Sequence, residues 1–189
     1  MGGQLELLDN DAVLHNVFFG IRPPAAAAVH IRCVGGDLVR SRRLVTKLLP
    51  PERLHVSLFA IGGFSGTCPP AVIDAAKAVA GNVSMAPFTV AFDRVASFAG
   101  GSGRRALVLT GDEGVAGLVR VQQVLSLAMK KAGLGLRQKE RFTPHVTIMY
   151  ADHKCDFAIE PISWTVDEFV LVDSLWGQSR HVQLGRWPL

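Results

Sequence analysis

The chain has 189 residues, of which 49% are hydrophobic and 19% are charged. This length and composition exclude an intrinsically disordered chain and allow one substantial core, or two small lobes that share it. No apolar run reaches transmembrane length, and the polar residues 1–11 are not typical of a signal peptide, so we expect a cytoplasmic protein. The net charge of +4 suits a phosphate-bearing partner but does not identify one.

Apolar runs separated by Gly and Pro predict alternating strands and helices within a single domain, 1–189, whose residues 1–12 form a flexible lead-in. Strands are expected at Val13–Ile21, Leu54–Ile61, Phe88–Phe98, Arg105–Thr110, Phe142–Tyr150, Ile162–Leu175 and His181–Trp187. Helices are expected at Ala25–Val39, at Pro69–Asn82 and, most clearly, at Glu113–Gly133. The glycine-rich turn at Ala99–Gly103 joins two of the strands as a hairpin, because no helix follows it as a phosphate-binding loop would require.

Two of the predicted strands carry the same short pattern, His55-Val56-Ser57 and His145-Val146-Thr147. Successive side chains of a strand point to opposite faces, so each His shares a face with its hydroxyl residue. A single His-x-Ser or His-x-Thr arises easily by chance and is then only structural. Two copies in similar apolar frames favour one site to which both contribute.

Two imidazoles with reference pKa values of about 6.5 and two hydroxyl groups suit phosphoryl transfer at a nucleotide 2′,3′-cyclic phosphate. One neutral imidazole can take a proton from water while the other, protonated, gives a proton to the departing ribose oxygen. The hydroxyls can hold the phosphate oxygens. A zinc site would need more ligands, and Asp152 and His153 lie beyond the strand end, so we expect neither a metal nor a cofactor. Three widely spaced cysteines, Cys33, Cys68 and Cys155, are expected to be reduced thiols.

A weak internal repeat places the two motifs in equivalent positions. Phe88-Thr89-Val90 and Trp164-Thr165-Val166 are 76 residues apart, as are Arg104 and Arg180, each of which opens an apolar strand. This repeat predicts two similar α+β lobes that each offer one His strand to a shared groove.

These residues resemble the 2H phosphoesterases, and more closely their bacterial 2′-5′ RNA ligase-like branch, which is also described as RNA 2′,3′-cyclic phosphodiesterases. The resemblance rests on the paired motifs and extends over nearly the whole chain. The remaining residues that carry it are Phe18-Phe19-Gly20-Ile21 with Pro23, Pro50–Leu54, Arg141–Pro144, Ser174, Arg180 and Trp187-Pro188-Leu189.

The resemblance implies a bilobal α+β fold, with two pseudo-symmetric antiparallel-sheet lobes, outer helices and a central groove. It implies metal-independent opening of RNA or nucleotide 2′,3′-cyclic phosphates to 2′-phosphomonoesters, with reversible 2′-5′ ligation in related members. His55 and His145 correspond to the catalytic pair, and Ser57 and Thr147 to the phosphate-holding hydroxyls. We also expect a monomer that has no membrane partner.

The chain departs from the family pattern at two places. Ser57 stands where threonine is commoner, and Met149-Tyr150 stands where relatives often have leucine and arginine, so one cation is missing. Arg141 is a candidate replacement, or else a surface charge.

Other residues leave alternatives open. Phe18 is a candidate for stacking on a base, or else a core residue, and His15 and His181 are expected to have no part in the site. The basic residues of 40–47 are either a solvated surface or an electrostatic guide for a polyanion. At the level of the whole protein, the alternative to an enzyme is a nucleotide- or RNA-binding module that retains the groove without turnover.

Overall fold

A computed structural model of the protein describes residues 14–99, 104–135 and 142–189. The lead-in 1–12 and Arg141 therefore lie outside the described residues. The helices of the described part are α1 (Ala25–Ser41), α2 (Pro70–Ala80) and α3 (Ala116–Lys131), with short 3-10 turns η1 (Pro51–Arg53) and η2 (Glu113–Val115). The strands are β1 (Leu14–Ile21), β2 (Val56–Ser65), β3 (Phe88–Phe98), β4 (Arg105–Thr110), β5 (Val146–Ala151), β6 (Asp156–Val166), β7 (Glu168–Leu175) and β8 (Arg180–Pro188).

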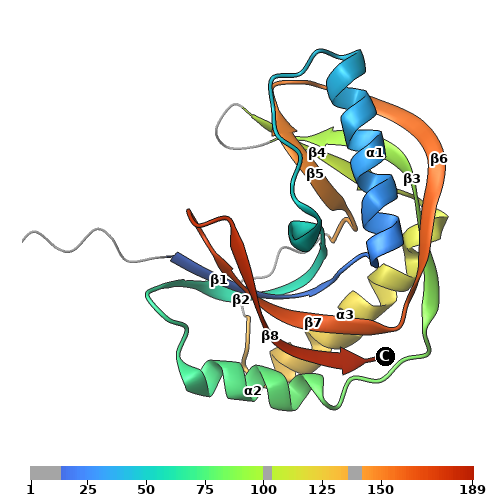
Figure 1. Ribbon diagram of the computed structural model, residues 1–189. Coiled ribbons are helices and arrows are strands. Elements are labelled where there is room, and N and C mark those ends of the chain that lie inside the picture. The colour runs from blue at the N-terminus through green and yellow to red at the C-terminus, as the bar shows by residue number, and fades with distance from the viewer. Residues whose placement is uncertain (1–13, 100–103, 136–141) are drawn as a thin grey trace, which may run out of the picture.

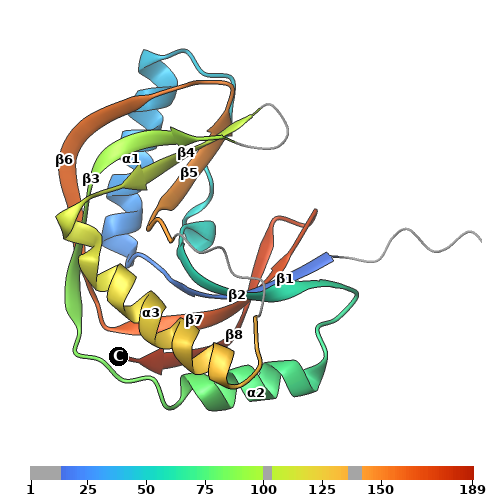
Figure 2. The same ribbon diagram turned by 180° about the vertical axis from the view of Figure 1, so that it is seen from behind.

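The strands form two four-stranded antiparallel sheets, in the orders β2-β1-β7-β8 and β5-β4-β3-β6. In both sheets, the strand that begins at the second residue of a His motif lies at the sheet edge. This strand is β2 in the first sheet and β5 in the second. Figure 1 shows the second sheet standing above the first, and Figure 2 shows the same arrangement from behind. The predicted α+β architecture of two antiparallel-sheet lobes with outer helices is confirmed.

The helices connect the two lobes. Helix α1 follows β1 of the first sheet but packs against β5 and β6 of the second. Helix α3 follows β4 of the second sheet but packs against β2 of the first, and also against β3. Each His strand is thus supported by a helix that begins in the opposite lobe, and the main hydrophobic core contains residues of both sheets.

The predicted strand Ile162–Leu175 is wrong. The chain leaves the second sheet at the end of β6, passes Asp167, and enters the first sheet as β7. The apolar run hides this crossing because β7 is an inner strand whose residues Phe169–Val172 are all buried, as are the alternate residues at the end of β6.

The internal repeat also differs from the predicted one. The equivalent units are β1-α1-β2 and β4-α3-β5, whose elements start 91, 91 and 90 residues apart (14 to 105, 25 to 116 and 56 to 146). The 76-residue spacing instead matched β4 with β8, although β4 is an inner strand and β8 an edge strand. The two His motifs still occupy equivalent positions, because His55 and His145 are 90 positions apart and the repeated elements are 90 or 91 positions apart.

No helix in the described ranges is long and apolar enough to cross a membrane.

Candidate active site

His55 lies between η1 and β2, just before the first residue of the strand. Its Nδ1 is 2.7 Å from the backbone carbonyl oxygen of Arg53. A carbonyl only accepts hydrogen bonds, so Nδ1 carries the proton and donates it, which leaves Nε2 as the free, reactive nitrogen. The ring is therefore held in one tautomer and one orientation by its own backbone.

His145 repeats this arrangement in front of β5. Its Nδ1 is 2.8 Å from the carbonyl oxygen of Thr143, so it too donates to the residue two positions earlier and keeps Nε2 free. The ring of Phe98 lies edge-on against it, with the centroids 5.1 Å apart. The start of β5 lies beside η1 in both Figure 1 and Figure 2.

The two histidines interact through their charges. Burial lowers the pKa of His55 from its ordinary value, although its hydrogen bond to the Arg53 carbonyl acts in the opposite direction. The nearby positive charge of His145 lowers the pKa of His55 further. The two imidazoles, 90 positions apart in the sequence, are therefore close enough for the charge of one to act on the other.

The two hydroxyl residues follow their histidines on the strands. Ser57 is exposed and pairs across the sheet with Gly20, and Thr147 is half-buried and pairs with Val108. Neither hydroxyl has a hydrogen-bond partner among the described residues. A side chain at Gly20 would be obstructed, since a Cβ atom there would lie 2.8 Å from the carbonyl oxygen of Val56. This glycine lets β1 approach the beginning of the His55 strand closely.

Phe18 supports the ring of His55 from the neighbouring strand. The two rings are 4.8 Å apart and tilted by 33°. Phe18 forms a small buried cluster with Val170 and Val172, separate from the main core, while Phe19 points the other way and belongs to that core. Because Phe18 is only 9% exposed, little of its ring is accessible to a base. Its role in substrate binding stays a prediction.

His181, which sequence reasoning set aside, lies against His55. The two ring centroids are 5.2 Å apart in an edge-on arrangement, and His181 also contacts the ring of Phe18. Burial, with the charge of His55, lowers the pKa of His181 to about 4. Its Nδ1 is buried without a hydrogen-bond partner in the described part of the chain. By contrast, His15 forms a 2.6 Å contact with Asp173 and contacts neither of these rings in the described structure.

The charged groups that act on His55 from the described residues are all cationic. Arg22 and Arg53 lower the pKa of both His55 and His181, and the Nε of each arginine is buried without a partner. Arg22 donates to Gln183 at 3.3 Å, and its own pKa is lowered by burial and by the charge of Arg186. A site with this charge attracts anions. Arg141, proposed from the sequence as the substrate cation, lies outside the described residues, whereas Arg22 and Arg53 were missed.

The pattern around the motifs could not reveal these neighbours. His181 approaches His55 only because β8 pairs with β7, and β7 in turn pairs with β1 from the other end of the chain. Within the described ranges, no three His, Cys, Asp or Glu side chains come together as metal ligands.

Comparison with solved structures finds the same fold. E. coli LigT in its apo form is 23% identical to this chain, with a TM-score of 0.72, and the match covers 94% of this chain and 98% of LigT. A protein of Thermus thermophilus is 19% identical, with a TM-score of 0.73 and coverage of 92% and 97%. LigT has also been solved with 3′-AMP, with ATP and with phosphate.

Comparison with curated proteins finds no match. The family model of the 2′-5′ RNA ligase superfamily, however, matches residues 23–177, which is most of the chain and includes both His motifs. On this evidence, the protein is a member of the 2′-5′ RNA ligase superfamily.

Proposed function

We propose that the protein is a cytoplasmic RNA 2′,3′-cyclic phosphodiesterase that forms 2′-phosphomonoesters by acid–base catalysis between His55 and His145, without a metal ion. The observation that carries the proposal is the twin geometry of the two rings. In each, Nδ1–H is fixed on the carbonyl two residues earlier and Nε2 is free. Membership of a superfamily of RNA ligases supports an enzyme of this kind.

His55 is suited to the role of general base. Its lowered pKa keeps the ring neutral near pH 7, with a lone pair on Nε2 that can accept a proton from water. The water oxygen then bonds to phosphorus as the bond from phosphorus to the ribose 3′ oxygen breaks. His145 in its protonated form gives its Nε2 proton to that leaving oxygen, so the product is a 2′-phosphomonoester with a free 3′-hydroxyl.

The remaining groups stabilise charge on the phosphate. The hydroxyls of Ser57 and Thr147 can donate hydrogen bonds to the non-bridging oxygens as charge develops on them. Arg22 and Arg53 add positive potential beside His55, which favours binding of the anionic substrate. If a 5′-hydroxyl of RNA replaces water, the same two proton transfers join the ends through a 2′-5′ linkage. The nucleotide complexes of E. coli LigT are consistent with a substrate of this class.

The test is to incubate the purified protein with adenosine 2′,3′-cyclic phosphate in the presence of EDTA and to identify the product by ³¹P NMR. We expect 2′-AMP, with no 3′-AMP, at a rate that EDTA does not change. Loss of turnover in EDTA would contradict the metal-independent mechanism. Tight binding of the cyclic nucleotide with no turnover would instead support the binding module.

A further inference from the structure

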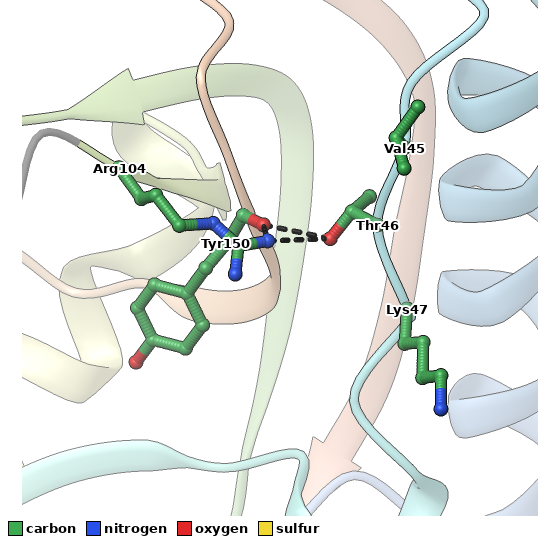
Figure 3. A pocket seen from close by; sticks show the side chains of 5 residues that line it. All are labelled: Val45, Thr46, Lys47, Arg104 and Tyr150. Atoms are coloured by element: carbon green, nitrogen blue, oxygen red, sulfur yellow. Dashed lines mark hydrogen bonds between the residues drawn. The ribbon is translucent and has the colours of Figure 1, made fainter.

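A cavity of about 500 Å³ lies beyond the second His motif, and its lining differs in chemistry from the site itself. It is lined by Val45, Thr46, Lys47, Arg104 and Tyr150. The segment between α1 and η1 runs along the free edge of β5, where Leu48 bridges Met149. The Thr46 hydroxyl donates to the Tyr150 carbonyl oxygen at 2.7 Å, and Arg104 donates to both of these oxygens. Figure 3 shows these bonds, which join the walls of the cavity.

The register of β4 and β5 places this cavity on the same face as the candidate active site. Val108 pairs with Thr147, but Ala106 pairs with Tyr150, because the register shifts by one residue between Leu107 and Val108. Ala106 and Val108 are two positions apart and so share a face. Because of this bulge, Tyr150 lies on the same face of β5 as Thr147, and the two residues are roughly 7 Å apart along the strand.

The lining suits a nucleotide. The Tyr150 ring is 47% exposed, and an exposed aromatic ring is a platform on which a base of any identity can stack. The backbone of Lys47 lies opposite that of Tyr150, because Leu48 and Met149 are bridge partners in an antiparallel pairing. The Lys47 side chain lines the cavity and extends away from the Tyr150 ring in Figure 3. Neither Lys47 nor Arg104 forms an ion pair with a carboxylate of the described residues. An aromatic platform beside cations that no carboxylate neutralises is the usual combination for binding a single strand of RNA.

We propose that this cavity binds the nucleotide adjacent to the reacting one, with its base on Tyr150 and its phosphate near Lys47 and Arg104. The preferred substrates are then RNA ends of two or more nucleotides rather than cyclic mononucleotides. This inference rests on the proposed function, because it places the cyclic phosphate between His55 and His145. It also assigns a role to the exposed ring of Tyr150.

The experiment compares two substrates on the full chain: adenosine 2′,3′-cyclic phosphate and the dinucleotide ApA with a 2′,3′-cyclic phosphate end. We expect kcat/KM to be higher for the dinucleotide. Tyr150→Ala should reduce that preference by about 5- to 150-fold, the range that loss of one base stack produces. The same variant should leave kcat/KM for the mononucleotide within about twofold, because nothing occupies the cavity in that case.

Two variants serve as controls, and a third tests the phosphate contact. Tyr150→Phe keeps the ring and should keep the preference for the dinucleotide. Trp176→Ala removes an aromatic side chain that is 69% exposed elsewhere on the protein, and it should leave kcat/KM unchanged for both substrates. Lys47→Gln should make kcat/KM for the dinucleotide less sensitive to salt, because one phosphate contact is lost.

The outcomes separate the two proposals. Equal kcat/KM for both substrates, unchanged in Tyr150→Ala, would overturn the role of the cavity and leave the proposed function intact. If neither substrate is turned over, the proposed function fails. A preference for the dinucleotide that Tyr150→Ala does not reduce would place the neighbouring nucleotide elsewhere and would overturn the inference.

Discussion

Replacing His55 or His145 with alanine is expected to lower kcat for 2′,3′-cyclic phosphate hydrolysis by about 10²- to 10⁴-fold in each case, because each ring supplies one proton transfer. The two effects should not multiply. The kcat of the double variant is expected to be close to that of the less active single variant, because a base without its acid partner contributes little to the rate. Initial rates of the four proteins, measured at saturating substrate, test this prediction.

The matched control is His30→Ala, which removes an exposed histidine from α1. This variant should keep the parent rate, and all variants should keep the parent circular dichroism spectrum. A His55→Ala or His145→Ala protein that is folded and retains more than a tenth of the parent kcat would show that the missing ring is not a catalytic group.

Phe169→Ala is expected to reduce the free energy of unfolding by about 3–5 kcal/mol, the usual cost of removing a buried phenylalanine ring. Phe169 is fully buried just after the chain crosses from the second sheet to the first. Its ring stacks on Trp187 with centroids 5.6 Å apart and contacts Phe19 at 5.9 Å. For a chain of this size, Tm should fall by about 6–20 °C.

Thermal unfolding followed by circular dichroism measures this effect. The control is Trp176→Ala, which removes a larger ring that is 69% exposed and should change the free energy of unfolding by less than about 0.5 kcal/mol. Similar losses in both variants would mean that the stacked aromatic cluster does not stabilise the fold.

The sequence predicted those features of the site that depend on local order. The alternation of strand residues predicted that His55 shares a face with Ser57 and His145 with Thr147. In the structure each His lies one residue before its strand, β2 or β5. Burial nevertheless alternates through both motifs, because Val56 and Val146 are buried while the His and hydroxyl residues on either side of them are not. The hydrogen bonds from each ring to the carbonyl two residues earlier are also local. They could not be expected from composition, however, because they depend on the backbone conformation of residues that precede the strands.

The features that sequence reasoning missed depend on pairings distant in sequence. Arg22 lies beside His55 because β1 pairs with β2. His181 lies beside His55 because β8 pairs with β7, which in turn pairs with β1. Tyr150 shares the face of Thr147 only because of the bulge in β5, whereas simple alternation would put it on the opposite face. The crossing at Asp167 was missed for a related reason: a run buried in two different sheets looks like one long strand.

The proposed mechanism depends on the claim that the rings of His55 and His145 act on one phosphate, which NMR titration of the histidine side chains can check. In the free protein, the pKa of His55 should lie below the ordinary value of about 6.5, because burial and the neighbouring cations disfavour its charged form. Added 2′-AMP, the expected product, should shift the Nε2 resonances of both rings with a single dissociation constant. A 2′-AMP titration that moves only one of these rings, or that moves them with different dissociation constants, would contradict the claim.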